Sequence, residues 1–306
     1  MTGDVVLVAS AGGHIDQAFE IAGRFAERSE RFWIATRTPQ TEALLAEERV
    51  EWVPDVRSRQ ALRAAKTLPG AFKIMRRNRP RMLVSTGSAL AVPYMLAARA
   101  TGVGVIYVES ATRLAGPSVT GRIAERIPGV QLFCQGKDWN RRRWTFFGSI
   151  FDRYQAEPAT PQPVKSALVT VGSEQFPFAR ALEAAREALV GVETCWQTGN
   201  TSVHGLGLEG DIRPWWRGDE LAQRALEADV VLTHAGVGSI LMVLRTGACP
   251  VVIPRMHELN EHIDDHQTQL SVTLAQRDLV VVAHPGDDLA SCIQEAASRR
   301  IVTSDG

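Results

Sequence analysis

The chain has 306 residues, of which 45% are hydrophobic and 22% charged, values typical of a soluble globular protein with about two domains. It contains no apolar run of the roughly 18 residues that a spanning helix needs, and its N-terminus leads directly into a predicted strand, so we expect a protein neither secreted nor integral to a membrane. Its four cysteines are widely spaced and lack Cys-x-x-Cys pairs, so we expect no structural zinc and a reducing compartment. Residues 1–155 carry 23 Lys and Arg against 14 Asp and Glu, whereas residues 156–306 carry 11 against 20. The opposite signs predict a domain boundary near residue 155 and an anionic partner for the first domain alone.

A strand followed by a glycine turn is expected at the start of the chain. Residues 4–10 are rich in valine and predict a buried parallel strand. The turn that follows contains Gly12 and Gly13, and His14 stands where a helix is expected to begin. His14 is either a structural residue of the helix start or a general base, because imidazole titrates near neutral pH.

An acid-free segment overlaps the next strand–helix pairs, whose strands are expected at residues 32–36 and 50–53. Residues 56–108 contain ten Lys and Arg, among them Arg76 and Arg77, but no Asp or Glu. A basic amphipathic helix in this segment is typical of a surface that binds anionic lipid headgroups. A solvated helix face is the simpler alternative. A nucleic-acid partner is disfavoured by the acidic second half and by the lack of a nucleic-acid-binding motif.

Two more strands, at residues 82–85 and 103–108, end in polar residues. The first leads into a Thr-Gly-Ser turn, and the second into Glu109 and Ser110, with Arg113 about one helical turn later. A carboxylate at the carboxyl end of a parallel strand lies where open α/β sheets bind ligands. The alternative is a helix-capping ion pair between Glu109 and Arg113, which is common at such ends.

The second half follows a proline-rich linker, predicted at residues 156–165. A strand at residues 167–172 ends in Gly172 and Ser173, which form its first glycine turn. A later strand leads into the second glycine turn, which reads His234-Ala235-Gly236-Val237-Gly238-Ser239.

In the second glycine turn the glycines let a ligand approach the backbone, and Ser239 is placed to cap the following helix. A helix N-terminus presents free N–H groups and a positive dipole end, so the turn predicts a phosphate site. Packing of strand against helix is the alternative reason for the two glycines. A polar loop after the next strand supplies groups that suit sugar hydroxyls, namely Glu261, His262, Asp265, His266 and Gln267.

Several of these motifs resemble those of one enzyme family. HAGVGS, followed by a strand, Pro-Arg, Glu-His and Asp-His-Gln, resembles the donor-binding half of inverting GT-B glycosyltransferases, in particular the family 28 C-terminal domain. Gly-Gly-His, Thr-Gly-Ser, Tyr-Val-Glu-Ser and Arg113 resemble the membrane-anchoring subunit of the eukaryotic transferase that adds the second GlcNAc to dolichol-diphosphate-GlcNAc. The chain therefore looks like a fusion of that subunit with its catalytic partner, as in bacterial exopolysaccharide relatives.

The resemblance implies an α/β fold of the GT-B type, with two Rossmann-like domains facing across a cleft. It implies inverting transfer from a UDP-sugar to a polyprenyl-diphosphate-linked sugar during cell-surface polysaccharide or glycan assembly. The enzyme would be cytoplasmic and peripheral to the inner face of the cell membrane, and we expect no nucleic-acid partner. The donor is a substrate, and no cofactor or metal is expected, in agreement with the lack of an Asp-x-Asp motif.

The resemblance also assigns residues to roles. The catalytic candidates are His14 and Glu109, which the sequence does not rank. The acceptor and membrane candidates are Gly12, Gly13, Ser110, Arg113, Arg76 and Arg77. The donor candidates are Gly172, Ser173, His234, Ala235, Gly236, Gly238, Ser239, Glu261, His262, Asp265, His266 and Gln267. Related enzymes often have a ribose-binding Glu three residues after the serine, where this chain has Met242.

Three rival functions remain open from the sequence. The first is a GT-B transferase for a soluble small molecule, which would not need the acid-free segment. The second is a UDP-sugar 2-epimerase of the same fold, which would release an isomer without any acceptor. The third is a non-catalytic module that binds a nucleotide sugar, for which Met242 is the main argument.

Overall fold

The computed structural model describes residues 4–54, 61–114, 116–137, 139, 141–172, 176–261 and 266–304, without the side chains of residues 61–65 and 266. The chain divides into two compact units between Ile150 and Phe151, earlier than the boundary predicted near residue 155. Among the described residues, no helix combines the length and the apolar character needed to cross a bilayer.

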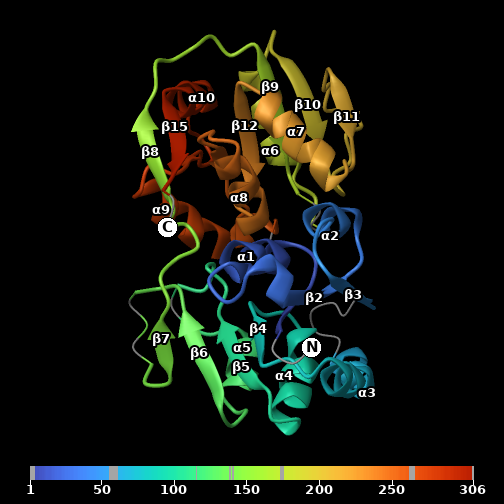
Figure 1. Ribbon diagram of the computed structural model, residues 1–306. Coiled ribbons are helices and arrows are strands. Elements are labelled where there is room, and N and C mark those ends of the chain that lie inside the picture. The colour runs from blue at the N-terminus through green and yellow to red at the C-terminus, as the bar shows by residue number, and fades with distance from the viewer. Residues whose placement is uncertain are drawn as a thin grey trace. The chain divides into compact units, whose positions relative to one another are not determined.

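The first unit is built on a seven-stranded, fully parallel sheet of order β3-β2-β1-β4-β5-β6-β7 (Figure 1). Its strands are short and apolar, and β1 is buried along its whole length, as expected where helices cover both faces of a parallel sheet. The strands are β1 (Val5–Ala9), β2 (Arg31–Thr36), β3 (Val50–Val53), β4 (Met82–Ser85), β5 (Gly104–Val108), β6 (Val130–Cys134) and β7 (Trp144–Phe146).

The helices of the first unit alternate with its strands. They are α1 (Gly13–Ala22), the 3-10 turn η1 (Arg28–Glu30), α2 (Pro39–Leu44), α3 (Ala61–Asn78), α4 (Ala91–Ala100) and α5 (Val119–Ala124). Thr38 caps α2 by accepting a hydrogen bond from the Thr41 N–H, and Pro39 occupies the first helical position, where its missing N–H costs nothing. Apolar residues of α3, α4 and α5 pack on one face of the sheet and form its core.

The second unit repeats this architecture with a six-stranded parallel sheet of order β11-β10-β9-β12-β13-β14. Its strands are β9 (Ser166–Thr170), β10 (Glu193–Gln197), β11 (Asp211–Arg213), β12 (Val230–His234), β13 (Val251–Ile253) and β14 (Val281–Val282). Its helices are α6 (Ala179–Ala188), α7 (Gly218–Glu227), α8 (Val237–Arg245), the 3-10 turn η2 (His257–Leu259), α9 (His266–Ala275) and α10 (Leu289–Ala297).

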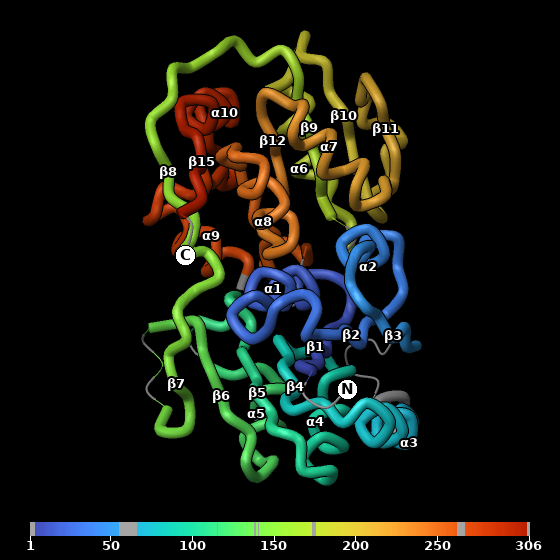
Figure 2. Tube along the Cα trace, viewed as in Figure 1, coloured from blue at the N-terminus to red at the C-terminus, as the bar shows by residue number. Residues whose placement is uncertain are grey.

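A separate antiparallel pair connects the start of the second unit to its end. Strand β8 (Tyr154–Pro158) pairs with β15 (Arg299–Thr303), and the two run side by side in the trace (Figure 2). Residues 156–158, the first part of the predicted linker, therefore belong to a strand. The prolines that suggested a linker do not prevent this, because a two-stranded ribbon leaves N–H groups that need no partner.

Both sheets have a topological switch point, which determines where a ligand can bind. In the first sheet β1 lies between β2 and β4, and in the second sheet β9 lies between β10 and β12. The loops that follow β1 and β4, and likewise those that follow β9 and β12, therefore leave in opposite directions. Such a reversal opens a crevice at the carboxyl ends of those strands, where open α/β sheets bind ligands. The pairs that define it are β1 with β4 and β9 with β12.

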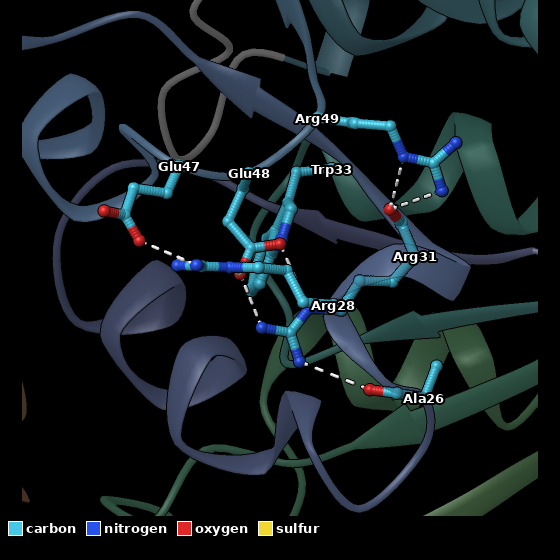
Figure 3. A network of polar contacts seen from close by, with 7 residues as sticks. All are labelled: Ala26, Arg28, Arg31, Trp33, Glu47, Glu48 and Arg49. Carbon is cyan, nitrogen blue, oxygen red and sulfur yellow. Dashed lines mark hydrogen bonds and ion pairs between the residues drawn. The ribbon is translucent and has the colours of Figure 1, made fainter.

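At the opposite edge of the first sheet, where β2 begins, polar side chains form a network around Glu48 (Figure 3). The Glu48 carboxylate, 1% exposed, accepts hydrogen bonds from the Arg31 guanidinium at 2.5 and 3.0 Å and from the Trp33 indole at 2.9 Å. Burial acts to raise the pKa of Glu48, but these hydrogen bonds outweigh it and hold the pKa below the ordinary value of 4.5. The network fixes the start of β2 against the turn that precedes β3.

We expect Glu48→Gln to lower the free energy of unfolding at pH 7 by about 1–3 kcal/mol, because a charged acceptor of several hydrogen bonds is lost. A lowered folded-state pKa stabilises the fold above the unfolded pKa of about 4.5 and loses this effect as the pH falls through the folded value. The difference in the free energy of unfolding between the wild-type protein and Glu48→Gln should therefore be smaller in acid. Urea denaturation at pH 7 and pH 4 measures both values, with the exposed Glu47→Gln as control; a gap that widens in acid would contradict the argument.

Candidate functional site

In the first unit, His14 joins the two loops of the switch point. Its Nδ1 lies 2.9 Å from the Thr86 carbonyl oxygen, and the Thr86 hydroxyl donates to the His14 carbonyl oxygen at 2.7 Å. A carbonyl only accepts, so Nδ1 carries the proton and Nε2 keeps its lone pair. Gly87 makes this fit possible, since a Cβ at that residue would lie 2.8 Å from the imidazole Cε1.

The charges around His14 favour its neutral form. Burial lowers the pKa of the imidazole below 6.5, and the positive charge of Arg113 lowers it further, while the Thr86 carbonyl and Glu109 act to raise it. The structure thus brings His14, Glu109 and Arg113 close enough for their charges to interact. A neutral imidazole with an available Nε2 lone pair has the protonation state that a general base requires.

Glu109 is fully buried, and protein donors surround its carboxylate. One oxygen accepts from the Ser110 N–H at 3.0 Å and the Tyr107 hydroxyl at 3.2 Å, and the other from the Ser118 N–H and hydroxyl, both at 2.9 Å. Gly121 packs against it so closely that a Cβ there would lie 2.3 Å from the second oxygen. This geometry suits a group that positions the segment between β5 and α5, and it distinguishes Glu109 from His14.

The other candidates of the first unit separate into two sets. Gly12, with φ of 88°, and Gly13, the first residue of α1, lie in the turn after β1, and the Ser110 hydroxyl is held within the same edge of the sheet. Arg76 and Arg77 lie in the last turn of α3, which leads into the start of β4, and so belong to the opposite edge. Arg77 forms an ion pair with Glu51, and the Arg76 guanidinium lies 5.7 Å from the Phe72 ring centre. The two arginines therefore cannot line a pocket with His14.

In the second unit a different histidine fills the crevice. His234 ends β12, is 7% exposed, and lies between Gly172 and Gly236. A Cβ at either glycine would approach the imidazole to 2.3 Å, and Gly172 also has φ of 73°. The loops after β9 and β12 can therefore come together only because both positions are glycine.

Helix α8 begins with Val237, Gly238 and Ser239, whose N–H groups have no acceptor within the helix because they form its first turn. The residue before the helix is Gly236, and no side chain caps it. The prediction that Ser239 is the cap is therefore wrong, because the helix begins two residues earlier than expected. Ala235 is fully buried, so it contributes backbone and not a side chain to this turn.

The polar loop after β13 is only partly described. The Glu261 carboxylate accepts two hydrogen bonds from the Arg180 guanidinium, at 2.8 and 2.9 Å, and the Gln267 side-chain oxygen accepts from the Arg255 N–H at 3.2 Å. His266 is the first residue of α9. Ser173, His262 and Asp265, together with the His266 side chain, lie outside the described residues. Met242 packs against the apolar cluster of Leu168, Trp216, Ala225, Val231 and Val243.

Comparison with known proteins identifies the second unit. Residues 166–301 match the glycosyltransferase family 28 C-terminal domain. This unit is a family 28 glycosyltransferase domain. The chain as a whole is 24% identical to a UDP-N-acetylglucosamine-N-acetylmuramyl-(pentapeptide) pyrophosphoryl-undecaprenol N-acetylglucosamine transferase of Methylococcus capsulatus, over 91% of this chain and 83% of the relative. The protein of the same name from Parasynechococcus marenigrum is 23% identical, over 96% and 87%.

Solved structures show that the family 28 unit and the first unit together form a GT-B fold. The crystal structure of Acinetobacter baumannii MurG matches with a TM-score of 0.57 and 19% identity, over 93% of this chain and 86% of that one. The S. aureus MnaA-UDP co-structure matches with a TM-score of 0.61 and 12% identity, over 97% and 91%. The prediction of two Rossmann-like domains in a GT-B glycosyltransferase is confirmed.

Two buried glutamines of this glycosyltransferase escaped the sequence reading. The Gln17 amide donates to the Gly13 carbonyl and the Ser110 hydroxyl, at 3.0 and 3.1 Å, and its oxygen accepts from the Ala111 N–H at 2.8 Å. Gln135 donates to the Glu109 carbonyl and accepts from the Ile150 N–H, both at 2.9 Å. Together they hold the ends of β1, β5 and β6. For Gln17 the available signal was a long polar side chain one helical turn after Gly13 and His14; Gln135, which follows β6, carried no comparable signal.

We expect Arg113→Gln to raise the pKa of His14, because the substitution removes a positive charge that lowers it. NMR titration of the His14 imidazole measures the change directly and needs no substrate. Arg122→Gln, which removes an exposed arginine from α5, is the control and should leave the titration where it is. A His14 pKa that stays constant or falls in the Arg113 variant would contradict the assigned neighbourhood.

Proposed function

We propose that this glycosyltransferase moves a sugar from a UDP-sugar to a hydroxyl of a polyprenyl-diphosphate-linked sugar, with inversion and without a metal ion. The observation that carries the proposal is the pair of topological switch points, one at the carboxyl edge of each sheet. One holds a neutral imidazole with an available Nε2 lone pair, and the other combines a glycine-lined turn with the N-terminus of α8. The named relatives support the nature of the donor and of the lipid-linked acceptor.

In the proposed reaction the second unit binds the donor. The diphosphate of the UDP-sugar accepts hydrogen bonds from the N–H groups of Val237, Gly238 and Ser239, and the α8 dipole stabilises its charge. These groups act more strongly on the leaving UDP than on the bound donor, because negative charge grows on the bridging oxygen as the sugar departs. The same groups would serve in place of a metal ion.

The first unit binds the acceptor and supplies the base. Nε2 of His14 takes the proton of the acceptor hydroxyl while that oxygen forms a bond to the anomeric carbon. The bond from the anomeric carbon to UDP breaks on the opposite face, which inverts the configuration. Gly12, Gly13, Ser110 and Arg113 would contact the acceptor, with Arg113 offering charge to its diphosphate.

The basic surface of α3 supports a location at the inner face of the cell membrane. Lys66, Lys73 and Arg76 are exposed on this helix, in a segment of the chain without acidic residues. Anionic headgroups would attract this surface, and each basic residue near a membrane contributes about 1 kcal/mol to binding. We propose peripheral attachment through α3, which would hold the acceptor site near its lipid substrate.

We expect the purified protein to transfer sugar from UDP-GlcNAc, or from another UDP-sugar selected by a thermal-shift panel, to a polyprenyl-diphosphate-linked sugar. His14→Ala should lower kcat by about 100- to 10,000-fold at unchanged donor KM, because a general base contributes that much. His204→Ala, on an exposed turn, is the matched control.

Transfer to a soluble acceptor alone, or release of a 2-epimer without acceptor, would favour the rival enzymes. UDP binding without any turnover would favour a binding module.

We expect the protein to bind vesicles that contain phosphatidylserine and to bind neutral vesicles weakly. Replacing Lys66, Lys73 and Arg76 by Gln should lower the partition coefficient roughly 100-fold, from about 1 kcal/mol per residue. The control removes equal charge from the second unit by replacing Arg186, Arg217 and Arg300. Co-sedimentation at low and high salt measures binding, and an equal loss in both variants would show that α3 is not the attachment surface.

A further inference from the structure

We propose that Arg255 is a positioning residue for the donor site. Its guanidinium binds residues beside the two segments assigned to the donor, which are the glycine turn after β9 and the polar loop between β13 and α9. The inference rests on the proposed function and extends it to a residue to which the sequence reading gave no role. Arg255 follows β13, and although it carries a charge it is 1% exposed. A buried guanidinium is costly unless its donors are satisfied, so its contacts point to what it does.

The first segment held by Arg255 is the glycine turn after β9. One terminal nitrogen of the guanidinium donates to the Val171 carbonyl at 3.0 Å, directly before Gly172. The other donates to the Phe176 and Pro177 carbonyls, at 2.9 and 3.3 Å. One planar group therefore fixes the distance between the two ends of this turn. Since Gly172 touches the His234 ring, the position of the turn also sets the shape of the crevice.

The second segment is the polar loop between β13 and α9. The same guanidinium donates to the Glu261 carbonyl at 3.3 Å, and the Arg255 main-chain N–H donates to the Gln267 side chain at 3.2 Å. Both ends of the loop that carries the sugar-binding candidates are thus held by Arg255. A displacement of this residue would move both donor segments together.

Contacts with an aromatic ring also hold the guanidinium of Arg255. The fully buried Phe178 ring has the guanidinium carbon of Arg255 at 4.4 Å from its centre and that of Arg180 at 5.2 Å. Arg180 in turn binds the Glu261 carboxylate through two hydrogen bonds and donates to the Pro254 carbonyl at 2.9 Å. Glu261 also accepts from the Met256 N–H at 3.1 Å. On this inference Glu261, predicted from the sequence as a donor-binding residue, acts on the donor site through Arg180 and the loop.

Lysine cannot replace Arg255 in this role, although it has the same charge. The guanidinium is planar, offers five N–H donors in a fixed fork and stacks on an aromatic ring, whereas an ammonium is a point charge with three donors. An ammonium at this place could not reach the Val171, Phe176 and Glu261 carbonyls at once. Arg255→Lys thus tests the planar arrangement of the guanidinium N–H donors and not the positive charge.

The experiment compares Arg255→Lys with the wild-type protein by calorimetric titration of UDP and by steady-state kinetics. We expect the Kd of UDP and the donor KM to rise at least tenfold, with acceptor KM unchanged and kcat at saturating donor within about threefold. Arg277→Lys is the matched control, because it removes a guanidinium that binds the Phe151 carbonyl at 2.9 Å, away from the donor segments. Circular dichroism and Tm confirm that each variant is folded.

A UDP affinity within twofold of wild type in folded Arg255→Lys overturns the inference alone. Absence of UDP binding by the wild-type protein overturns the proposed function, and the inference with it. If Arg255→Lys does not fold, the inference is tested by measuring UDP affinity in Glu261→Gln, in Arg180→Gln and in the double variant. We expect each single change to weaken UDP binding about equally and the double change to weaken it no further. Additive losses, or a loss from Glu261→Gln alone, would mean that Glu261 binds the nucleotide directly.

Discussion

The structure depends on one steric constraint: in each unit an imidazole ring occupies the switch-point crevice, and it fits because the facing residue is glycine. In the first unit His14 lies in the first turn of α1, which follows β1, and meets Gly87 after β4. In the second unit His234 ends the fourth strand and meets Gly172 after the first. The reversed strand order creates the space, and glycine leaves room for a flat ring. A side chain on either glycine would separate the loops that the chemistry needs close together.

The local fields at the two crevices matter more than the net charge of each half of the chain. The second half has an excess of nine acidic residues, yet the first turn of α8 presents N–H groups that have no acceptor within the helix. Charges further away than a Debye length of about 10 Å are screened, whereas the first turn of α8 acts within hydrogen-bond distance. In the first half burial is the main cause that lowers the pKa of His14, and the positive charge of Arg113 adds a smaller effect in the same direction.

Much of this arrangement could be predicted from the sequence because it depends on local patterns. Valine-rich strands, glycine turns and the placement of His14 and His234 at strand ends all follow from short segments. Contacts between distant residues could not be predicted. Arg180 meets Glu261 across 81 positions, and Gln17 meets Ala111 across 94. The start of α8 was misjudged because a serine after glycines is a good cap, but Gly236 already has the extended backbone of a capping residue.

Of the acidic residues that the sequence nominated, Glu109 and Glu261 are described by the structure and have the same kind of environment. Each is a buried carboxylate whose oxygens accept several protein hydrogen bonds, and each holds a loop at the carboxyl edge of its sheet. A carboxylate free of such partners would repel a diphosphate by several kcal/mol at short range in a partly buried site. Engaging both carboxylates with protein donors leaves imidazole and backbone N–H groups to face the substrates. Under the proposed function both substrates carry a diphosphate, which gives a physical reason for pairing these carboxylates within the protein.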